Sequence, residues 1–207
     1  MKILLSPCSI VLCLFFTFQN LYSQENVKSD FNRMEYGIGI GLNYSGYNQS
    51  FESSNLFDGM SLLPAVHIRG AYKFSPKLKL SLGPGISWKG NEVSEPIVGE
   101  DLIGVYIDLP LLLHADIYKN LSILGGFEGS YLVQLGNKDS VFPDGKMIYA
   151  AKMGVGYSIG NLVELNFSYS HGLTDVFSLE FTNLNGQFID TGRWKNKVFQ
   201  LGIVFRQ

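Results

Sequence analysis

Cysteine is almost absent from this sequence, and its placement excludes several kinds of site. The 207 residues contain two cysteines, Cys8 and Cys13. Both lie in an N-terminal segment in which Lys2 precedes an apolar run and Ser23 supplies a small residue at the end. This layout predicts a secretory signal peptide over residues 1–23. The mature chain would then lack cysteine, which excludes a disulfide, thiol chemistry and a cysteine-based metal centre.

Charged residues are also scarce, and neither sign dominates. They make up 16% of the chain, with 16 basic residues against 18 acidic ones, and loss of Lys2 would leave a net charge of −3. A nucleic-acid partner normally requires a basic patch or a strongly basic chain. We therefore expect no nucleic-acid partner.

Helical periodicity is the third absence. No useful length of chain repeats its apolar residues every 3.6 positions, and the apolar run at residues 10–18 is too short to cross a bilayer as a helix. Instead the chain holds 23 glycines, 11 tyrosines and 15 phenylalanines. Strands and barrel corners use these residue types. The mature length of about 184 residues fits one all-β domain.

The stretch 105–135 shows a two-residue alternation most clearly. From Val105 to Ile117 every second residue is apolar, while the other face carries Asp108 and His114. After a turn at residues 118–120 the alternation resumes. Each half exceeds ~10 residues, which is long for a soluble strand but suits a tilted strand that crosses a bilayer. One apolar face and one polar face is the pattern of a membrane β-barrel.

Eight segments of this kind follow one another along the chain. They are residues 35–47, 62–74, 78–89, 105–117, 121–135, 147–159, 162–171 and 197–206. Short connections, including a two-residue turn at Gly160 and Asn161, alternate with long ones at residues 48–61, 90–102, 136–146 and 172–196. This alternation predicts an eight-stranded antiparallel up-and-down transmembrane β-barrel over residues 35–207, with short periplasmic turns and long extracellular loops. Residues 24–34 would be a periplasmic lead-in.

The direction of the faces separates this barrel from a soluble one. A soluble barrel places its bulky apolar side chains inside. Here glycines and charges share the narrow face, so the bulky apolar face belongs outside, in lipid. Pro64, Pro84 and Pro110 interrupt the strands, since proline cannot donate to a ladder. Each is expected either at a bulge or near a strand end.

The face predicted to line the lumen carries ten ionisable residues. They are His67, Arg69, Lys79, Lys89, Asp108, His114, Asp116, Glu128, Lys152 and Glu164. Eight strands leave a lumen just wide enough for side chains, and an unpaired charge inside it would cost several kcal/mol. We therefore expect Arg69, Lys79 and Lys152 to neutralise Asp108, Glu128 and Glu164 in a plug that closes the lumen to solutes. The alternative for these residues is a proton relay or an ion path.

Candidate chemical sites are few. His67 and His114 face inward, but no third metal ligand stands at a matching spacing. His171 lies beside Ser168 and Ser170, with Asp175 in the next loop, as a hydrolase at the outer rim would need. However, the consecutive Ser170 and His171 point to opposite faces of a regular strand, whereas a nucleophile must reach its base. We therefore expect no catalytic, cofactor-binding or metal-binding residues, and no enzyme.

Three phrases carry a family resemblance. The signal ends in Ser-Gln, residues 106–113 read Tyr-Ile-Asp-Leu-Pro-Leu-Leu-Leu, and residues 168–173 read Ser-Tyr-Ser-His-Gly-Leu. Together they resemble the PorT-like outer-membrane β-barrel proteins of Bacteroidota over roughly residues 35–207. The resemblance implies a barrel in the outer membrane of a Gram-negative bacterium, and an association of the founding member with protein secretion. It implies no cofactor.

The long loops hold most of the remaining information on function. Their aromatic residues are Phe51, Phe57, Phe142, Phe177, Phe181, Phe188 and Trp194. Such residues can bind a partner or pack together to close the barrel mouth. We predict a monomeric, non-enzymatic barrel that contacts outer-membrane lipid and lipopolysaccharide, and that binds a protein or surface ligand chiefly through residues 172–196. The alternatives are a lipid A-type hydrolase at the barrel rim and a small-solute channel.

Overall fold

The computed structural model describes residues 33–49, 59–91, 102–135, 146–182 and 187–207. The predicted signal peptide lies outside these residues, and so does most of the predicted lead-in. The described residues form ten strands: β1 Met34–Gln49, β2 Ser61–Ser75, β3 Leu78–Leu82, β4 Gly85–Asn91, β5 Leu102–Tyr118, β6 Leu121–Leu135, β7 Lys146–Ile159, β8 Val163–Gly172, β9 Phe177–Thr182 and β10 Phe188–Arg206. In this part of the chain no helix has the length and apolar character needed to cross a membrane.

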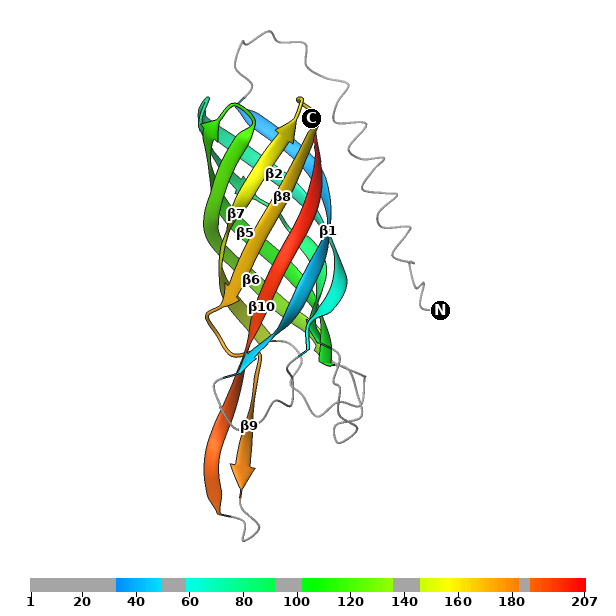
Figure 1. The fold of residues 1–207 in the computed structure, drawn as a ribbon, viewed down its shortest axis with the longest axis vertical. Helices are drawn as coiled ribbons and strands as arrows, with labels where there is room; N and C mark the ends of the chain where they lie inside the picture. Colours follow the sequence, from blue (N-terminus) through cyan, green and yellow to red (C-terminus); the bar gives the residue numbers. More distant parts are fainter. Residues whose placement is uncertain (1–32, 50–58, 92–101, 136–145, 183–186) are drawn as a thin grey trace, which may run out of the picture. The chain divides into compact units, whose positions relative to one another are not determined.

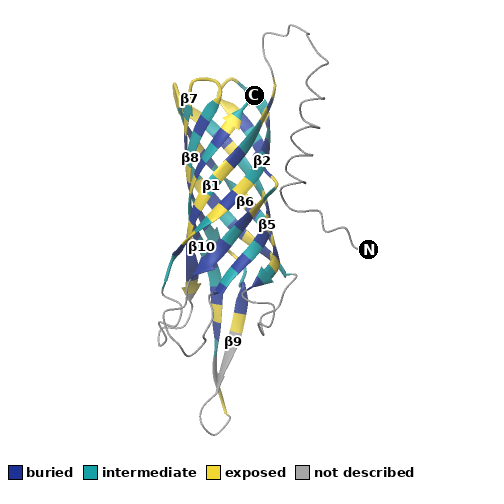
Figure 2. Ribbon diagram, turned by 90° about the vertical axis from the view of Figure 1, so that its right-hand side faces the viewer, coloured by how far each residue is buried: buried dark blue, intermediate teal, exposed yellow. Residues whose placement is uncertain are grey.

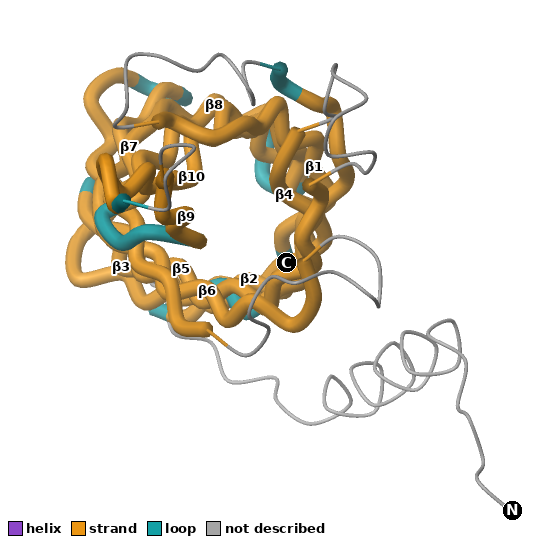
Figure 3. The backbone as a smooth tube through the Cα atoms, turned by 90° about the horizontal axis from the view of Figure 1, so that it is seen from below, coloured by secondary structure: helices purple, strands orange, loops and turns teal. Residues whose placement is uncertain are grey.

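The strands close into a ring (Figure 3). Each neighbouring pair is antiparallel, and β1 pairs with β2 on one side and with β10 on the other. Strands β3 and β4 occupy one position together, because both pair with β2 and with β5. Strand β9 pairs with β10 and adds no position to the ring. The predicted eight-stranded up-and-down barrel is therefore confirmed.

Alternating burial shows which face meets lipid (Figure 2). In β5, Tyr106 and Asp108 are 0% and 9% exposed. The residue that follows each of them, Ile107 and Leu109 respectively, is 50% and 49% exposed. Polar side chains thus point into the lumen and bulky apolar ones point out. This inverted pattern is that of a transmembrane barrel. The predicted orientation of the faces is confirmed.

The third predicted strand, residues 78–89, is broken where Pro84 interrupts it. Gly83 and Pro84 separate β3 from β4, and across the break the Gly83 N–H donates to the Pro110 carbonyl at 3.2 Å. The N–H and C=O of a strand residue point to the same neighbour. The missing N–H of Pro110 therefore faces the break, where the ladder is already interrupted. Pro110 itself sits neither at a bulge nor at a strand end, so that expectation was wrong for this residue.

Three short turns lie at one end of the ring, here named the turn end. Two of them have two residues each, after Ser75 and after Tyr118, and Lys119 takes a φ of 30°. The third runs from Gly160 to Leu162, because Ile159 pairs with Val163. The predicted two-residue turn therefore has three residues, with Gly160 in the left-handed region at φ 61°. The C-terminal Gln207 donates its N–H to Tyr36 at the same end.

The opposite end, here named the loop end, differs from the prediction. Residues 172–196 were expected to form one long loop, but β9 and the first part of β10 pair within it from Phe177 and Trp194 to Thr182 and Phe188. The resulting hairpin projects beyond the ring (Figure 1). Strand β10 consequently begins nine residues before the predicted strand 197–206. In a barrel of this kind the short turns are periplasmic and the loop end is extracellular.

Two adjacent glycines in β6 offer a test of this geometry. A Cβ on Gly126 would meet the Leu111 carbonyl oxygen at 2.1 Å, whereas a Cβ on Gly125 would meet nothing within 4 Å. We expect Gly126→Ala to lower the free energy of unfolding by about 1–3 kcal/mol through overpacking, and Gly125→Ala to change it by less than about 0.5 kcal/mol. Urea unfolding of the purified barrel in lipid vesicles measures both. Equal effects of the two variants would contradict the assigned faces.

Candidate functional sites in the lumen and at the loop end

Five charged side chains meet in the lumen near the short turns and form the turn-end cluster. They are Glu35, Arg69, Lys79, Glu164 and Arg206, each at most 10% exposed. Arg69 holds Glu164 with two parallel hydrogen bonds, of 2.6 and 2.9 Å. Lys79 and Arg206 donate to the same carboxylate at 3.1 and 3.2 Å. The two carboxylates are thus surrounded by three buried cations.

Lys73 brings the turn-end cluster to water. Glu35 accepts hydrogen bonds from Arg69 at 3.1 Å and from Lys79 at 3.3 Å. Its second oxygen lies 3.2 Å from Nζ of Lys73, whose side chain is 34% exposed. Lys73 therefore connects the buried ions to solvent at the turn end.

A second group, the central cluster, lies deeper in the lumen. It consists of Lys89, Asp108, Glu128 and Lys152. Nζ of Lys89 donates to Asp108 at 2.7 Å and to Glu128 at 2.6 Å, while Lys152 donates to the other oxygen of Glu128 at 2.8 Å. Two carboxylates and two ammonium groups balance here. Charge-assisted hydrogen bonds of these lengths are the strong kind.

These contacts confirm that the lumen charges pair, and they correct the partners. Arg69 and Lys79 neutralise Glu164, and Lys152 neutralises Glu128, but Asp108 pairs with Lys89. Asp116, which was expected in the lumen, is exposed near the turn end.

Two partners of Glu164 and Arg69 were missing from the predicted set. They are Arg206 and Glu35, at the two ends of the predicted barrel. Both lie on the polar face of their strands, in step with Gly37 and Gly202. Both lie within the predicted strands 35–47 and 197–206, so applying the two-residue alternation to the end residues of these strands would have found them.

Apolar and aromatic side chains close the lumen at the loop end and form the mouth cluster. They are Tyr47, Leu102, Tyr106, Leu132, Leu135, Ile148, Val176, Phe177 and Trp194. The rings of Phe177 and Trp194 stack at 4.9 Å, and Tyr47 meets Phe177 edge-on at 5.3 Å. The sequence left open whether the loop aromatics bind a partner or pack together to close the mouth. Phe177 and Trp194 pack together in the mouth.

Among the other loop aromatics, the structure describes the side chain of Phe188, which does not share this role. Phe188 is 62% exposed near the tip of the hairpin. The side chain of Phe181 and the residues Phe51, Phe57 and Phe142 lie outside the part of the chain that the structure describes. For those four the alternatives stay open.

A cavity of about 60 Å³, here named the lumen chamber, lies between the two charge clusters. Its lining includes Arg69 of the turn-end cluster and Asp108, Glu128 and Lys152 of the central cluster. His67 and His114, the candidate metal ligands, both line it. Among the described residues no three His, Cys, Asp or Glu side chains gather to hold a metal ion. The expectation of no metal site stays a prediction.

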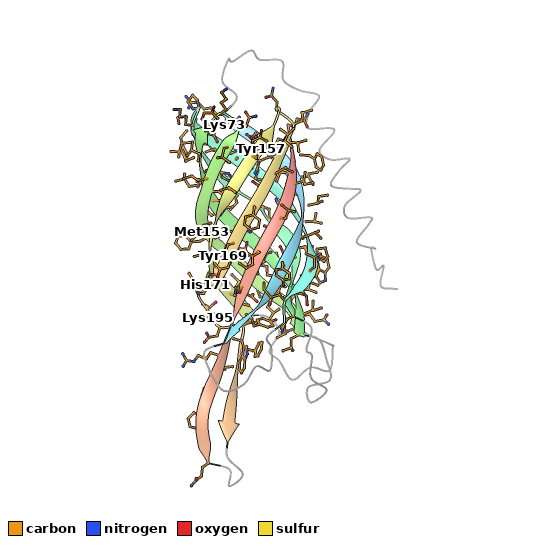
Figure 4. The ribbon with its side chains drawn as sticks, viewed as in Figure 1. Lys73, Met153, Tyr157, Tyr169, His171 and Lys195 are labelled. Atoms are coloured by element: carbon orange, nitrogen blue, oxygen red, sulfur yellow. The ribbon has the colours of Figure 1, made fainter. Side chains whose placement is uncertain are left out.

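The rim residues are not brought together as a hydrolase would need. His171 points outward, and its Nδ1 lies 3.2 Å from the Tyr169 hydroxyl (Figure 4). Ser168 and Ser170 are 3% and 4% exposed on the lumen side of the same strand. Asp175 lies 3.9 Å from Arg193 instead. These serines therefore share no face with His171.

One serine–histidine hydrogen bond does occur, inside the lumen, and sequence reasoning missed it. Ser81 Oγ lies 2.7 Å from Nε2 of His114. The other ring nitrogen of His114 is buried and has no partner in the described part of the chain, so no acid there orients the base. The adjoining chamber holds about 60 Å³, far less than the several hundred Å³ of an ordinary ligand pocket.

A ring of eight strands with an inverted polarity and a filled lumen defines a small transmembrane β-barrel. The model of the outer membrane protein beta-barrel domain matches residues 19–178, and the chain belongs to this family. It is accordingly an outer-membrane protein. No curated protein matches the sequence.

Several solved structures are similar at low sequence identity. The attachment invasion locus protein Ail of Yersinia pestis is 15% identical, with 85% of this chain and 100% of that chain covered and a TM-score of 0.48. Neisserial surface protein A is 12% identical, with 84% and 97% covered and a TM-score of 0.49. OprG from Pseudomonas aeruginosa is 11% identical, with 84% and 95% covered and a TM-score of 0.44.

Removing one buried carboxylate should disrupt the lumen. Glu164→Gln leaves Arg69, Lys79 and Arg206 around Glu35 alone, and a broken buried ion pair costs about 3–5 kcal/mol. We expect a loss of that size in the free energy of unfolding, measured by urea titration in lipid vesicles. Asp116→Asn, an exposed carboxylate near the same end, is the matched control and should change it by less than about 0.5 kcal/mol. A Glu164→Gln effect no larger than the control's would contradict the cluster's role.

The filled lumen should not conduct solutes. Ion pairs of the two charge clusters cross the lumen, and the mouth cluster packs across its loop end. Purified protein in planar bilayers is expected to show no stable conductance of porin size. Trp194→Ala, which opens only the mouth, should still show none, because the charge clusters remain. Reproducible large openings of the unaltered protein would overturn the closed-lumen interpretation.

Proposed function

We propose that this protein is a non-enzymatic outer-membrane barrel that binds a partner protein through the hairpin of β9 and the first part of β10. The observation that carries the proposal is the projection of this hairpin beyond the ring (Figure 1). Among the described strands, β9 pairs with β10 only. The edge of an exposed strand is a template for an extended segment of another protein.

The base of the hairpin is held firmly, which supports a binding role. Val176 donates its N–H to the Trp194 carbonyl at 2.7 Å, and the stacked Phe177 and Trp194 rings are buried in the mouth cluster. A strand edge presented from a rigid base loses little entropy when it pairs with a partner. Ser178, the next residue, is exposed. The anchored base and the exposed strand beyond it are what a docking arm requires.

Lipopolysaccharide is the lipid partner that the outer wall fits best. At the loop end of β8 and β10, His171 pairs in register with Lys197, and Lys195 lies two residues before Lys197 on the same outward face. Figure 4 shows Tyr169, His171 and Lys195 succeeding one another toward the loop end. No ion pair joins Lys195 or Lys197 to an acid within the described residues. Cations at this depth face the negatively charged head groups of the outer leaflet.

The finer family assignment belongs to this proposal. The PorT-like resemblance makes association with a protein-secretion machine one version of partner binding. The hairpin would then contact a component of that machine or its cargo at the cell surface. We expect the barrel to act as a monomer, because its lumen charges are satisfied within one chain.

The two alternatives find less support in the geometry. A hydrolase would need a serine beside His171 on the outward face, but Ser168 and Ser170 are buried on the lumen side. A small-solute channel would need a continuous passage, but ion pairs cross the lumen at two levels. Neither alternative explains the anchored hairpin.

A cross-linking experiment in cells tests the binding proposal. A photo-reactive amino acid at the exposed Ser178 should yield an adduct with a partner protein, whereas the same group at the lipid-facing Ile123 should not. Replacing residues 179–191 by a short glycine turn keeps Phe177 and Trp194, so the barrel should still fold. Its fold can be checked on gels, where the unboiled sample should migrate differently from the boiled sample. This replacement should abolish partner capture by a second probe at Arg193.

The controls separate loss of binding from loss of structure and from catalysis. The same replacement of residues 136–145, in another predicted outer loop, should leave the adduct intact. Mass spectrometry of lipid A should be unchanged by His171→Ala. A deacylated lipid A that requires His171 would establish the hydrolase instead. An adduct at Ser178 no stronger than at Ile123 would show that the hairpin is not the binding surface.

A further inference from the structure

The lumen chamber has polar side chains among apolar ones in its wall. Its lining includes His67, Ser81, His114, Asn166, Arg69 and Glu128, from both charge clusters and from the wall between them. Its volume of about 60 Å³ compares with the 10–15 Å³ that one water molecule needs by the same measure. The chamber therefore has room for about four to six water molecules.

Two buried polar atoms in the chamber wall have no hydrogen-bond partner among the described residues. They are Nδ1 of His114 and Oδ1 of Asn166. His114 is 1% exposed, and its ring is held in place by the 2.7 Å contact between Nε2 and Ser81. Unpaired polar atoms in a buried site are costly, and ordered water is their usual partner. Both atoms belong to residues that line one space of sufficient size.

The chamber lies beside both charge clusters. His67 and His114 line it, together with Arg69 of the turn-end cluster and Asp108, Glu128 and Lys152 of the central cluster. Among the described residues no ion pair joins the two clusters.

We propose that the lumen chamber is a hydration site. Its water molecules hydrogen-bond His114 Nδ1 and Asn166 Oδ1 and join the turn-end and central clusters into one proton-exchanging network. Toward the loop end the network meets the mouth cluster, most of whose side chains are apolar. At the other end Lys73 brings it to solvent. The network therefore exchanges protons with solvent at the turn end.

Water-to-protein magnetisation transfer in solid-state NMR tests the proposal on the intact barrel in lipid bilayers. Signal should build up on the His114 ring nitrogens several-fold faster than on the lipid-facing Ile123, and at a rate comparable with that of Lys73. A build-up on His114 as slow as that on Ile123 would show a dry chamber and would overturn the proposal.

A pair of glycine variants locates the water. Gly202 lines the chamber, and an added Cβ would meet the Ile40 carbonyl at an ordinary 3.5 Å, so Gly202→Leu fills the space. Gly125→Leu faces lipid and is the matched control. Transfer to His114 should fall several-fold in Gly202→Leu and stay unchanged in Gly125→Leu. Undiminished magnetisation transfer to His114 in a folded Gly202→Leu barrel would show that the water lies elsewhere. If that variant does not fold, the measurement on the unaltered protein decides the question.

Discussion

A backbone that crosses hydrocarbon must satisfy its hydrogen bonds within the protein, because no water is present to do so. In this chain the pairing of β1 with both β2 and β10 removes the two edges that an open sheet would leave. Closure at eight positions then sets the width of the lumen to roughly that of its own side chains. Because this narrow lumen is filled by side chains, the charged ones inside it must pair with one another, as the backbone groups do.

The lumen charges meet this requirement as networks rather than as isolated pairs. Glu164 accepts hydrogen bonds from three cations on three other strands, and Glu128 accepts from two. Shifting any of these strands by one residue would turn its charges into the lipid. The ring closure and the charge clusters therefore depend on the same strand register, and each stabilises the other only when that register is correct.

The loop end follows different chemistry. Beyond Lys89, whose Nζ lies 5.2 Å over the Tyr106 ring, the lumen changes from ionic to apolar. The mouth cluster takes residues from the strands and from the base of the hairpin, so the surface arm and the transmembrane ring are one packed unit. The segments outside the membrane can vary without disturbing this scaffold, and we propose that partner binding takes place there.

Two-residue alternation and connection length are local properties of the chain, so the class of protein could be predicted without the structure. They predicted the barrel, its eight strand positions, the face that meets lipid and most of the residues that line the lumen. The pairing of particular charges, such as Asp108 with Lys89, became known from the folded chain, as did the position of Pro110 opposite the break at Pro84. The tertiary structure alone showed the hairpin of β9, whose six residues are too few to establish a period. Contacts such as those of Arg69 with Glu164, 95 positions apart, depend on the register of distant strands, and local alternation does not encode that register.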